Sequence, residues 1–287
     1  MDDLGQFTQT FLGILKTRIT QEKLPLPLPS SVVDRIHGVV RDSTKGETEM
    51  GEVVASDPIL AAQVLVAAGN GKAGRAKQVT ALPDTVSRLG AATLRRLLKE
   101  AAVHEVFHSR VPGANDALSR LSRHSKAVAL LAREVAGLAG FPDADVAYLA
   151  GLLHDIEQLV VAVYLMEIEK ALVKQPSFAW PEWLDYHAWL EVLNETREEI
   201  GDALVSKWNL PDALKQAITG IQDFDVANRV SLGNLVHFAN AMATRAGICL
   251  EETDADEVEA VLMVGCSFLG LQKEMVDRMV NDIEERV

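Results

Sequence analysis

The sequence has 287 residues, 48% of them hydrophobic, which is enough to bury one large core or two smaller ones. Its 41 acidic residues outnumber its 28 basic ones, and the resulting net charge of −13 disfavours direct binding to nucleic acid or to anionic membrane surfaces. Two cysteines without a CxxC pair, together with the lack of a leader-like start or an uninterrupted apolar span, predict a cytoplasmic protein without disulfides.

Apolar residues recur at helical spacing along almost the whole chain, while alternating runs bounded by hairpin turns are missing, so the sequence predicts an all-α fold. A first helix is expected over residues 3–21, because the proline-rich LPLPLPS at 24–30 ends it. Further helical segments are predicted over residues 30–41, 46–57, 59–71, 82–110, 117–140, 194–211 and 231–287, and another follows Asp143. The VPGAND loop at 111–116 separates two helical halves.

The segment VAYLAGLLHDIEQLV at 146–160 places His154 and Asp155 side by side in an otherwise aliphatic helix. Neighbouring side chains on a helix diverge by about 100°. His154 and Asp155 can therefore bind the same ion only if it lies between the two helix faces that they occupy. His124, in the preceding helix, is well placed to supply a third ligand, and imidazole and carboxylate groups suit Zn, Fe or Mn. The alternative is a buried network of hydrogen bonds among these three side chains.

Over residues 24–220 the sequence resembles the HDOD family, a branch of the HD superfamily of metal-dependent phosphohydrolases found as bacterial signalling modules. The matching motifs are LPLPSSV, SDPILAAQVLVAAGNG, ALPDTVSRLGAATLRRLL, RHS, AGLLHDIEQL and IGDALVSKWNLPDALKQAI. The resemblance implies a two-lobed helical bundle. In this division an N-terminal helix at 1–22 precedes a helical lobe at 23–112, and residues 113–287 form an HD-domain-like lobe that closes with a helix pair.

The resemblance also implies that the hydrolytic site is degenerate. Catalytic HD proteins hold their metal with a histidine, the HD pair and a later aspartate, and His124, His154 and Asp155 match the first three. Ligands of the family are replaced here at Arg197, Ile221, Gln222 and Asn240. A two-metal centre needs ligands for both ions, so this chain is expected to have lost one. The remaining three ligands can still hold one ion, with Glu157 as an additional carboxylate.

A second pattern, HEVFH at 104–108, fits the H-E-x-x-H zinc motif, in which Glu105 would be the general base. The extended form of this motif includes a third ligand, which this sequence lacks. Glu134 is another candidate for the third ligand, but it lies on a predicted helix of ordinary amphipathic pattern. We therefore expect His104 and His108 to be partly exposed residues at a helix end.

The Pro- and Trp-rich connection at 176–190 carries Trp180, Trp183 and Trp189. Amphipathic rings of this kind are candidates for an exposed contact with a protein partner. The alternative is that they fill the gaps where helices cross.

Taken together, the sequence predicts a non-catalytic module of a signalling or gene-control pathway that binds a regulatory protein or a small ligand. We expect no cofactor, or at most one divalent metal ion, and no direct contact with nucleic acid or membrane. The alternative is a metal-dependent phosphohydrolase acting on a nucleotide or phosphate ester. The partner, the signal and the oligomeric state are left open.

Overall fold

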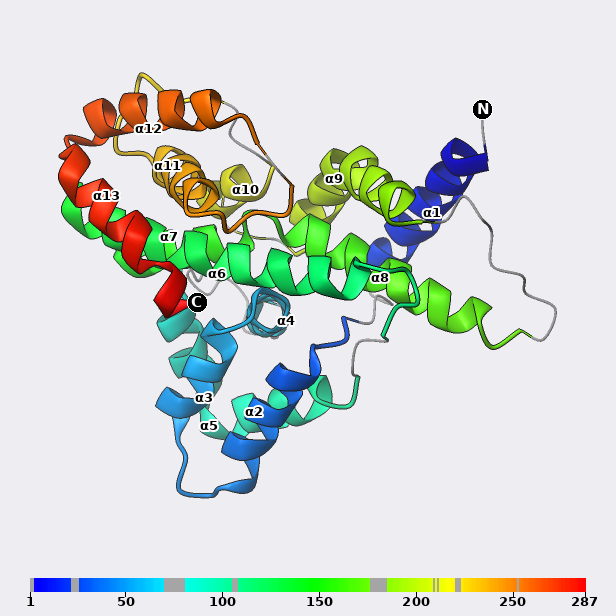
Figure 1. The fold of residues 1–287 in the computed structure, drawn as a ribbon. Coiled ribbons are helices and arrows are strands. Elements are labelled where there is room, and N and C mark those ends of the chain that lie inside the picture. Colours follow the sequence, from blue (N-terminus) through cyan, green and yellow to red (C-terminus); the bar gives the residue numbers. More distant parts are fainter. Residues whose placement is uncertain are drawn as a thin grey trace.

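The computed structural model describes residues 3–21, 26–69, 81–104, 108–175, 185–208, 210, 212–219, 223–251 and 253–287. These residues form helices and connecting turns, with no β-strand longer than a single bridge at Leu28, so the all-α prediction is confirmed (Figure 1). The helices are α1 (Asp3–Thr20), α2 (Ser30–Arg41), α3 (Glu47–Ala55), α4 (Pro58–Gly69), α5 (Leu82–Ala101), α6 (Ala114–Leu138), α7 (Ala144–Leu153), α8 (Ile156–Leu172), α9 (Tyr186–Trp208), α10 (Asp212–Ile218), α11 (Leu232–Arg245), α12 (Ala255–Leu269), α13 (Lys273–Asp282) and the 3₁₀ turn η1 (Glu284–Arg286).

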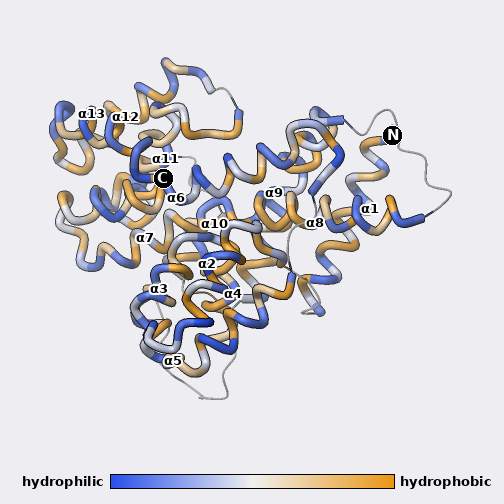
Figure 2. The backbone as a smooth tube through the Cα atoms, turned by 60° about the horizontal axis from the view of Figure 1, so that its bottom comes forward, coloured by the Kyte–Doolittle hydropathy of each residue, from blue (hydrophilic) through white to orange (hydrophobic). Residues whose placement is uncertain are grey.

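The first lobe consists of α2 to α5, and α4 joins it to the rest of the molecule. Its sequence, PILAAQVLVAAG, is apolar on every side, and a helix of that kind is stable only when it is buried. Helix α4 contacts α3 and α5 on one side and α6, α7 and α8 on the other. Hydrophobic stretches of the chain accordingly face the middle of the molecule, with hydrophilic stretches at the outer turns (Figure 2).

Helix α5 is interrupted at Gly90, whose φ of 73° lies in the region that glycine adopts without a steric penalty. The carboxylate of Glu47 in α3 accepts the freed N–H of Ala91 at 2.9 Å. Beyond the kink, Arg95 donates to backbone carbonyls at the end of α2. The predicted helical segment at 82–110 is therefore a kinked helix that ends at Ala101.

The second lobe is built around α6, which packs against α7 on one side and α11 on the other. Helices α12 and α13 cover α11, and α10 lies against α7 and α11. Helices α6 and α7 lie close together at Gly151 of α7, where an added Cβ would lie 2.9 Å from the Cα of Ala129 in α6. Only a glycine fits there, and this contact sets how near α7 can lie to α6.

Helix α1 packs against α9 of the second lobe, although it precedes the first lobe in the sequence (Figure 1). The Phe11 ring lies 5.7 Å from the Tyr164 ring of α8, and the Lys16 ammonium pairs with Glu199 of α9 at 2.7 Å. The predicted loop at 111–116 overlaps the start of α6, which begins at Ala114.

The stretch Ala144–Leu172, which spans α7 and α8, is long and apolar enough to cross a membrane. Inside the folded protein, however, 94% of its most apolar window is buried. Burial in the protein core accounts for its composition.

Candidate functional site

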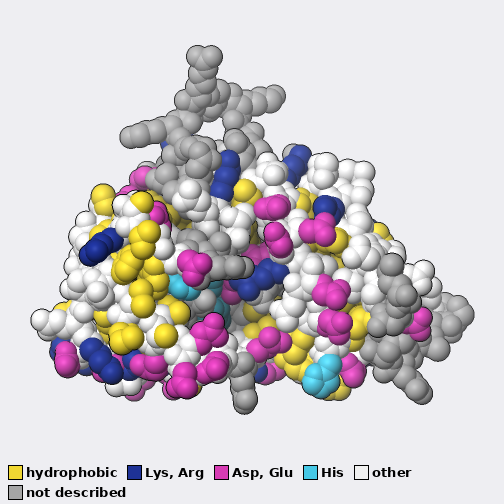
Figure 3. Space-filling view, turned by 90° about the horizontal axis from the view of Figure 1, so that it is seen from above, with side chains coloured by type: hydrophobic (Ala, Val, Ile, Leu, Met, Phe, Trp, Pro, Cys, Tyr) yellow, Lys and Arg dark blue, Asp and Glu magenta, His cyan; other side chains and the backbone are white. Residues whose placement is uncertain are grey.

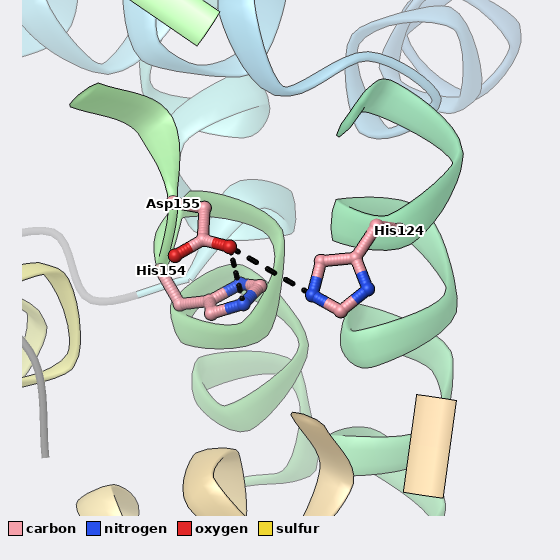
Figure 4. A group of neighbouring side chains, drawn as sticks. All are labelled: His124, His154 and Asp155. Carbon is pink, nitrogen blue, oxygen red and sulfur yellow. Dashed lines mark ion pairs between the residues drawn. The ribbon is translucent and has the colours of Figure 1, made fainter. Parts of the chain in front are cut away.

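His154 and Asp155 lie at a break between two helices. Helix α7 ends at Leu153 and α8 begins at Ile156, and Asp155 has a φ of −118° and a ψ of 27°, outside the helical range. The expectation that the HD pair lies within one continuous helix is therefore wrong. Because the backbone turns at this point, the two side chains do not diverge as they would on a helix, and both lie towards His124 of α6 (Figure 4).

The three side chains form a compact group of possible metal ligands. Asp155 Oδ2 lies 3.2 Å from His154 Nε2 and 3.7 Å from His124 Nε2. One donor atom from each residue falls within 4.8 Å of the other two, and all three residues are buried. The predicted assembly of His124 with the HD pair is thus present in the fold.

Backbone carbonyls fix the orientation of both imidazole rings. His124 Nδ1 lies 2.5 Å from the carbonyl oxygen of Ile248, and His154 Nδ1 lies 2.8 Å from that of Gly151. A carbonyl can only accept, so both Nδ1 atoms carry a proton and both Nε2 atoms lie on the side of Asp155. Burial, and then the neighbouring His154, lower the pKa of His124, which favours its neutral form.

This arrangement fits one divalent cation. His154 Nε2 is buried and has no well-aligned hydrogen-bond partner among the described residues, as expected for an atom that holds a ligand. Metal-binding histidines commonly donate their other N–H to a carbonyl or carboxylate, as both rings do here. The ligands would be the two Nε2 atoms and Asp155 Oδ2, and an ion so held supplies Lewis acidity and acidifies bound water.

Arg197 of α9 provides a positive charge beside this group. Its guanidinium donates to Asp155 Oδ1 and, at 2.9 Å, to Glu157 Oε1. These two carboxylates are buried, whereas the Arg197 side chain is 46% exposed, so the network reaches the surface through the arginine. Figure 3 shows histidine and basic side chains together in a hollow on this face of the molecule.

Burial and neighbouring charges alter the pKa values of Asp155 and Glu157. Burial alone would raise the pKa of Asp155, but His154 and the Arg197 guanidinium hold it well below its usual range. Burial, followed by repulsion from Asp155, raises the pKa of Glu157 well above its usual range, while Arg197 acts against the shift. The network therefore carries one firmly ionised carboxylate, and Arg197 neutralises it.

Asn240, predicted to replace the later aspartate of the family, lies next to the metal-ligand group. Its side chain hydrogen-bonds to His124 from α11. A neutral amide at this point adds no negative charge to the site. Ile221 and Gln222, the other predicted replacements, lie outside the described residues.

The H-E-x-x-H pattern does not form one helix. Helix α5 ends at Ala101, His104 and His108 are both exposed, and Glu105 lies outside the described residues. Glu134, the candidate third ligand, instead pairs with Arg286 at 2.9 Å. The described part of the pattern thus agrees with the expected exposed histidines, although His104 follows the helix end.

Among the three tryptophans, Trp180 and Trp183 lie outside the described residues. Trp189 is only 3% exposed and stacks on Tyr186 at a ring separation of 6.2 Å. The expectation of an exposed contact at Trp189 is therefore wrong, because its side chain is part of the hydrophobic core.

Comparison with solved structures places the fold among known proteins. The MmoQ response regulator of Methylococcus capsulatus strain Bath is 18% identical with a TM-score of 0.67, over 89% of this chain and 97% of that one. A fragment of the same regulator is 19% identical with a TM-score of 0.64, over 88% of this chain and 94% of that one. An HDOD domain protein of unknown function from Geobacter sulfurreducens is 19% identical with a TM-score of 0.40, over 96% of this chain and 98% of that one. The likeness to the two MmoQ structures concerns the fold.

A search of curated proteins found no relative of this sequence. The HDOD domain model, in contrast, matches residues 26–224, which include every motif that the sequence comparison drew on and the whole of the His124, His154 and Asp155 group. Because this match spans well over half of the chain, the protein belongs to the HDOD family.

Proposed function

We propose that this HDOD protein is a non-catalytic regulatory module, which takes part in a signalling or gene-control pathway by binding another protein or a small ligand. The observation that carries the proposal is the position of Arg197. Its guanidinium donates to Asp155 Oδ1 and Glu157 Oε1, so one oxygen of each carboxyl group is held by the arginine.

The charge of this network argues against a hydrolytic centre with two metals. Two-metal hydrolysis requires ligands for both ions, and Asp155 retains only Oδ2 for coordination. Arg197 adds a permanent positive charge, which repels a second cation at short range. Asn240 contributes no charge to offset it.

An alternative function has a specific observation in its favour. His154 Nε2 is buried without a well-aligned hydrogen-bond partner among the described residues, and His124, His154 and Asp155 place one possible ligand atom each within 4.8 Å of one another. A single divalent ion held there would support a phosphohydrolase acting on a nucleotide or phosphate ester. The two functions predict different results in one experiment.

The experiment is a turnover assay on the purified protein with added Mn²⁺, Fe²⁺ or Zn²⁺, using a phosphate monoester, a phosphodiester and a cyclic dinucleotide. The proposal predicts that wild-type turnover equals that of His154→Ala. The matched control is His187→Ala, an exposed histidine on α9. Turnover that His154→Ala abolishes and His187→Ala retains would establish the phosphohydrolase instead.

The proposed macromolecular partner is a regulatory protein. The net charge of −13 disfavours a nucleic-acid backbone, because like charges repel and basic contacts dominate such binding. Fluorescence polarisation with labelled random-sequence DNA and RNA at low salt is expected to show no binding. Salt-sensitive binding of either one would contradict this part of the proposal.

A further inference from the structure

A cavity of about 470 Å³ lies between the first lobe and α6, and none of His124, His154 and Asp155 lines it. One wall is formed by the beginning of α2, at Ser30 and Ser31, and by Asp57 between α3 and α4. The opposite wall is formed by α6, including Arg123 and Lys126. The cavity thus has one wall from each lobe, and its volume is in the range typical of sites for small molecules.

Three cationic side chains line this cavity, which is unusual in a protein whose net charge is −13. Arg123 has a partner, the carboxylate of Glu284 at 3.5 Å. Arg35 of α2 and Lys126 of α6 form no ion pair with any carboxylate among the described residues. Arg35 and Lys126 line the same cavity from the two lobes, and partial burial, followed by the nearby charge of Arg35, lowers the pKa of Lys126.

The one acidic side chain in the cavity wall is already engaged by the backbone. Asp57 is 2% exposed, and its Oδ1 accepts the N–H of Leu60 at 2.8 Å, at the start of α4. Arg35 is near enough to Asp57 to oppose the effect of burial on its pKa, but no ion pair forms between them. The positive charge of Arg35 and Lys126 therefore remains available to a ligand.

The start of α2 adds to the positive potential of this wall. Pro29 precedes the helix and offers no side-chain cap, and the first turn of α2 contains no acidic residue. N–H groups at a helix start and the positive end of the helix dipole favour anions. The helix start supports the two cations from α2 and α6, which carry the main attraction.

We propose that this cavity binds a phosphate-bearing small molecule of about nucleotide size, with its phosphate held between Arg35 and Lys126. Arginine and lysine from opposite walls would neutralise the phosphate through charge-assisted hydrogen bonds. The rest of the cavity would hold the organic part of the ligand. Because Arg35 belongs to the first lobe and Lys126 to the second, the ligand would join the two lobes.

The test measures thermal unfolding and calorimetric binding with inorganic phosphate, adenosine monophosphate and adenosine, at an ionic strength held constant with sodium chloride. We expect both phosphate compounds to raise the unfolding temperature and adenosine to leave it unchanged. Arg35→Gln and Lys126→Gln should each weaken phosphate binding by about tenfold or more, as expected when one charge-assisted hydrogen bond is lost.

Two control variants locate the ligand. Arg41→Gln removes an exposed cation from the last turn of the same helix, outside the cavity, and is expected to bind phosphate as the wild type does. His154→Ala is also expected to retain binding. The proposal is wrong if the phosphate compounds act no more strongly than adenosine, if all three cation variants lose binding equally, or if His154→Ala alone abolishes it. Circular dichroism checks that each variant is folded.

Discussion

Arg197 and Asp155 form an ion pair in which the guanidinium takes one carboxylate oxygen and leaves the other beside two histidines. Asp155 therefore faces the Arg197 guanidinium on one side and the Nε2 atoms of His154 and His124 on the other. Arg197 replaces a ligand for a second metal, and it also places a positive charge beside the buried carboxyl groups of Asp155 and Glu157. The ion pair offsets part of the cost of burying these carboxylates, while His154 Nε2 and Glu157 Oε2 stay buried without a hydrogen-bond partner among the described residues.

Arg197→His is expected to increase the affinity for a divalent metal. The change removes a positive charge next to Asp155 and adds an imidazole, so we expect the dissociation constant for Mn²⁺ or Zn²⁺ to fall by about tenfold or more. Equilibrium dialysis with metal analysis measures this affinity directly. Arg120→His is the control, because Arg120 donates to the carbonyl of Cys249 on the surface. Equal affinities in wild type and Arg197→His would show that the arginine does not oppose metal binding.

The periodic features of this fold could be predicted from the sequence, and its local irregularities could not. Helical spacing of apolar residues is a strong signal, so the helices and the approach of His124 to the HD pair followed from it. The break at Asp155 has no glycine or proline to mark it. The pairing of Arg197 with acids 40 and 42 residues away depends on how α8 and α9 pack, which short-range patterns do not encode.

Gly151→Ala is expected to destabilise the protein and to disturb the HD site. The new Cβ would lie 2.9 Å from Ala129 Cα and from the carbonyl oxygen of Val128, so α7 must move away from α6. Overpacking of this kind costs about 1–3 kcal/mol of unfolding free energy. The movement would also carry His154 away from His124, so residual metal affinity should fall.

Gly137→Ala is the matched control, since this glycine lies in α6 with nothing within 4 Å of the added Cβ. It is expected to stabilise the protein by about 0.5–1 kcal/mol, because alanine favours a helix over glycine. Urea denaturation measures both variants. Equal effects of the two substitutions would refute the proposed close contact between α6 and α7.

Arg95→Lys is expected to destabilise the first lobe. The Arg95 guanidinium donates to the carbonyls of Val39 at 3.0 Å, Val40 at 2.7 Å and Lys45 at 2.5 Å, at the end of α2 and the loop that follows. A lysine ammonium keeps the charge but cannot reach this fan of acceptors, so about 1–3 kcal/mol of unfolding free energy should be lost.

Arg96→Lys makes the same substitution one residue further on, at an exposed side chain that pairs with Glu100 at 2.8 Å. An exposed pair of this kind contributes at most about 0.5 kcal/mol, so the variant should unfold almost as the wild type does. Thermal and urea unfolding of both variants provide the comparison. If Arg96→Lys proved as costly as Arg95→Lys, the capping of α2 by Arg95 would not explain the loss.

Asp57→Asn is expected to change how stability depends on pH. Burial raises the pKa of Asp57 from 3.8 to about 6, so between these values the folded protein binds more protons than the unfolded chain does. The stability that Asp57 contributes is therefore fully present below pH 3.8 and is lost as pH rises through about 6, by about 3 kcal/mol in total. Asparagine keeps an oxygen that can accept the Leu60 N–H and has no such titration. The difference in unfolding free energy between variant and wild type should therefore grow in favour of the variant from pH 4 to pH 7. Urea denaturation across this range measures the difference, and a constant value would show that Asp57 titrates alike in the folded and unfolded states.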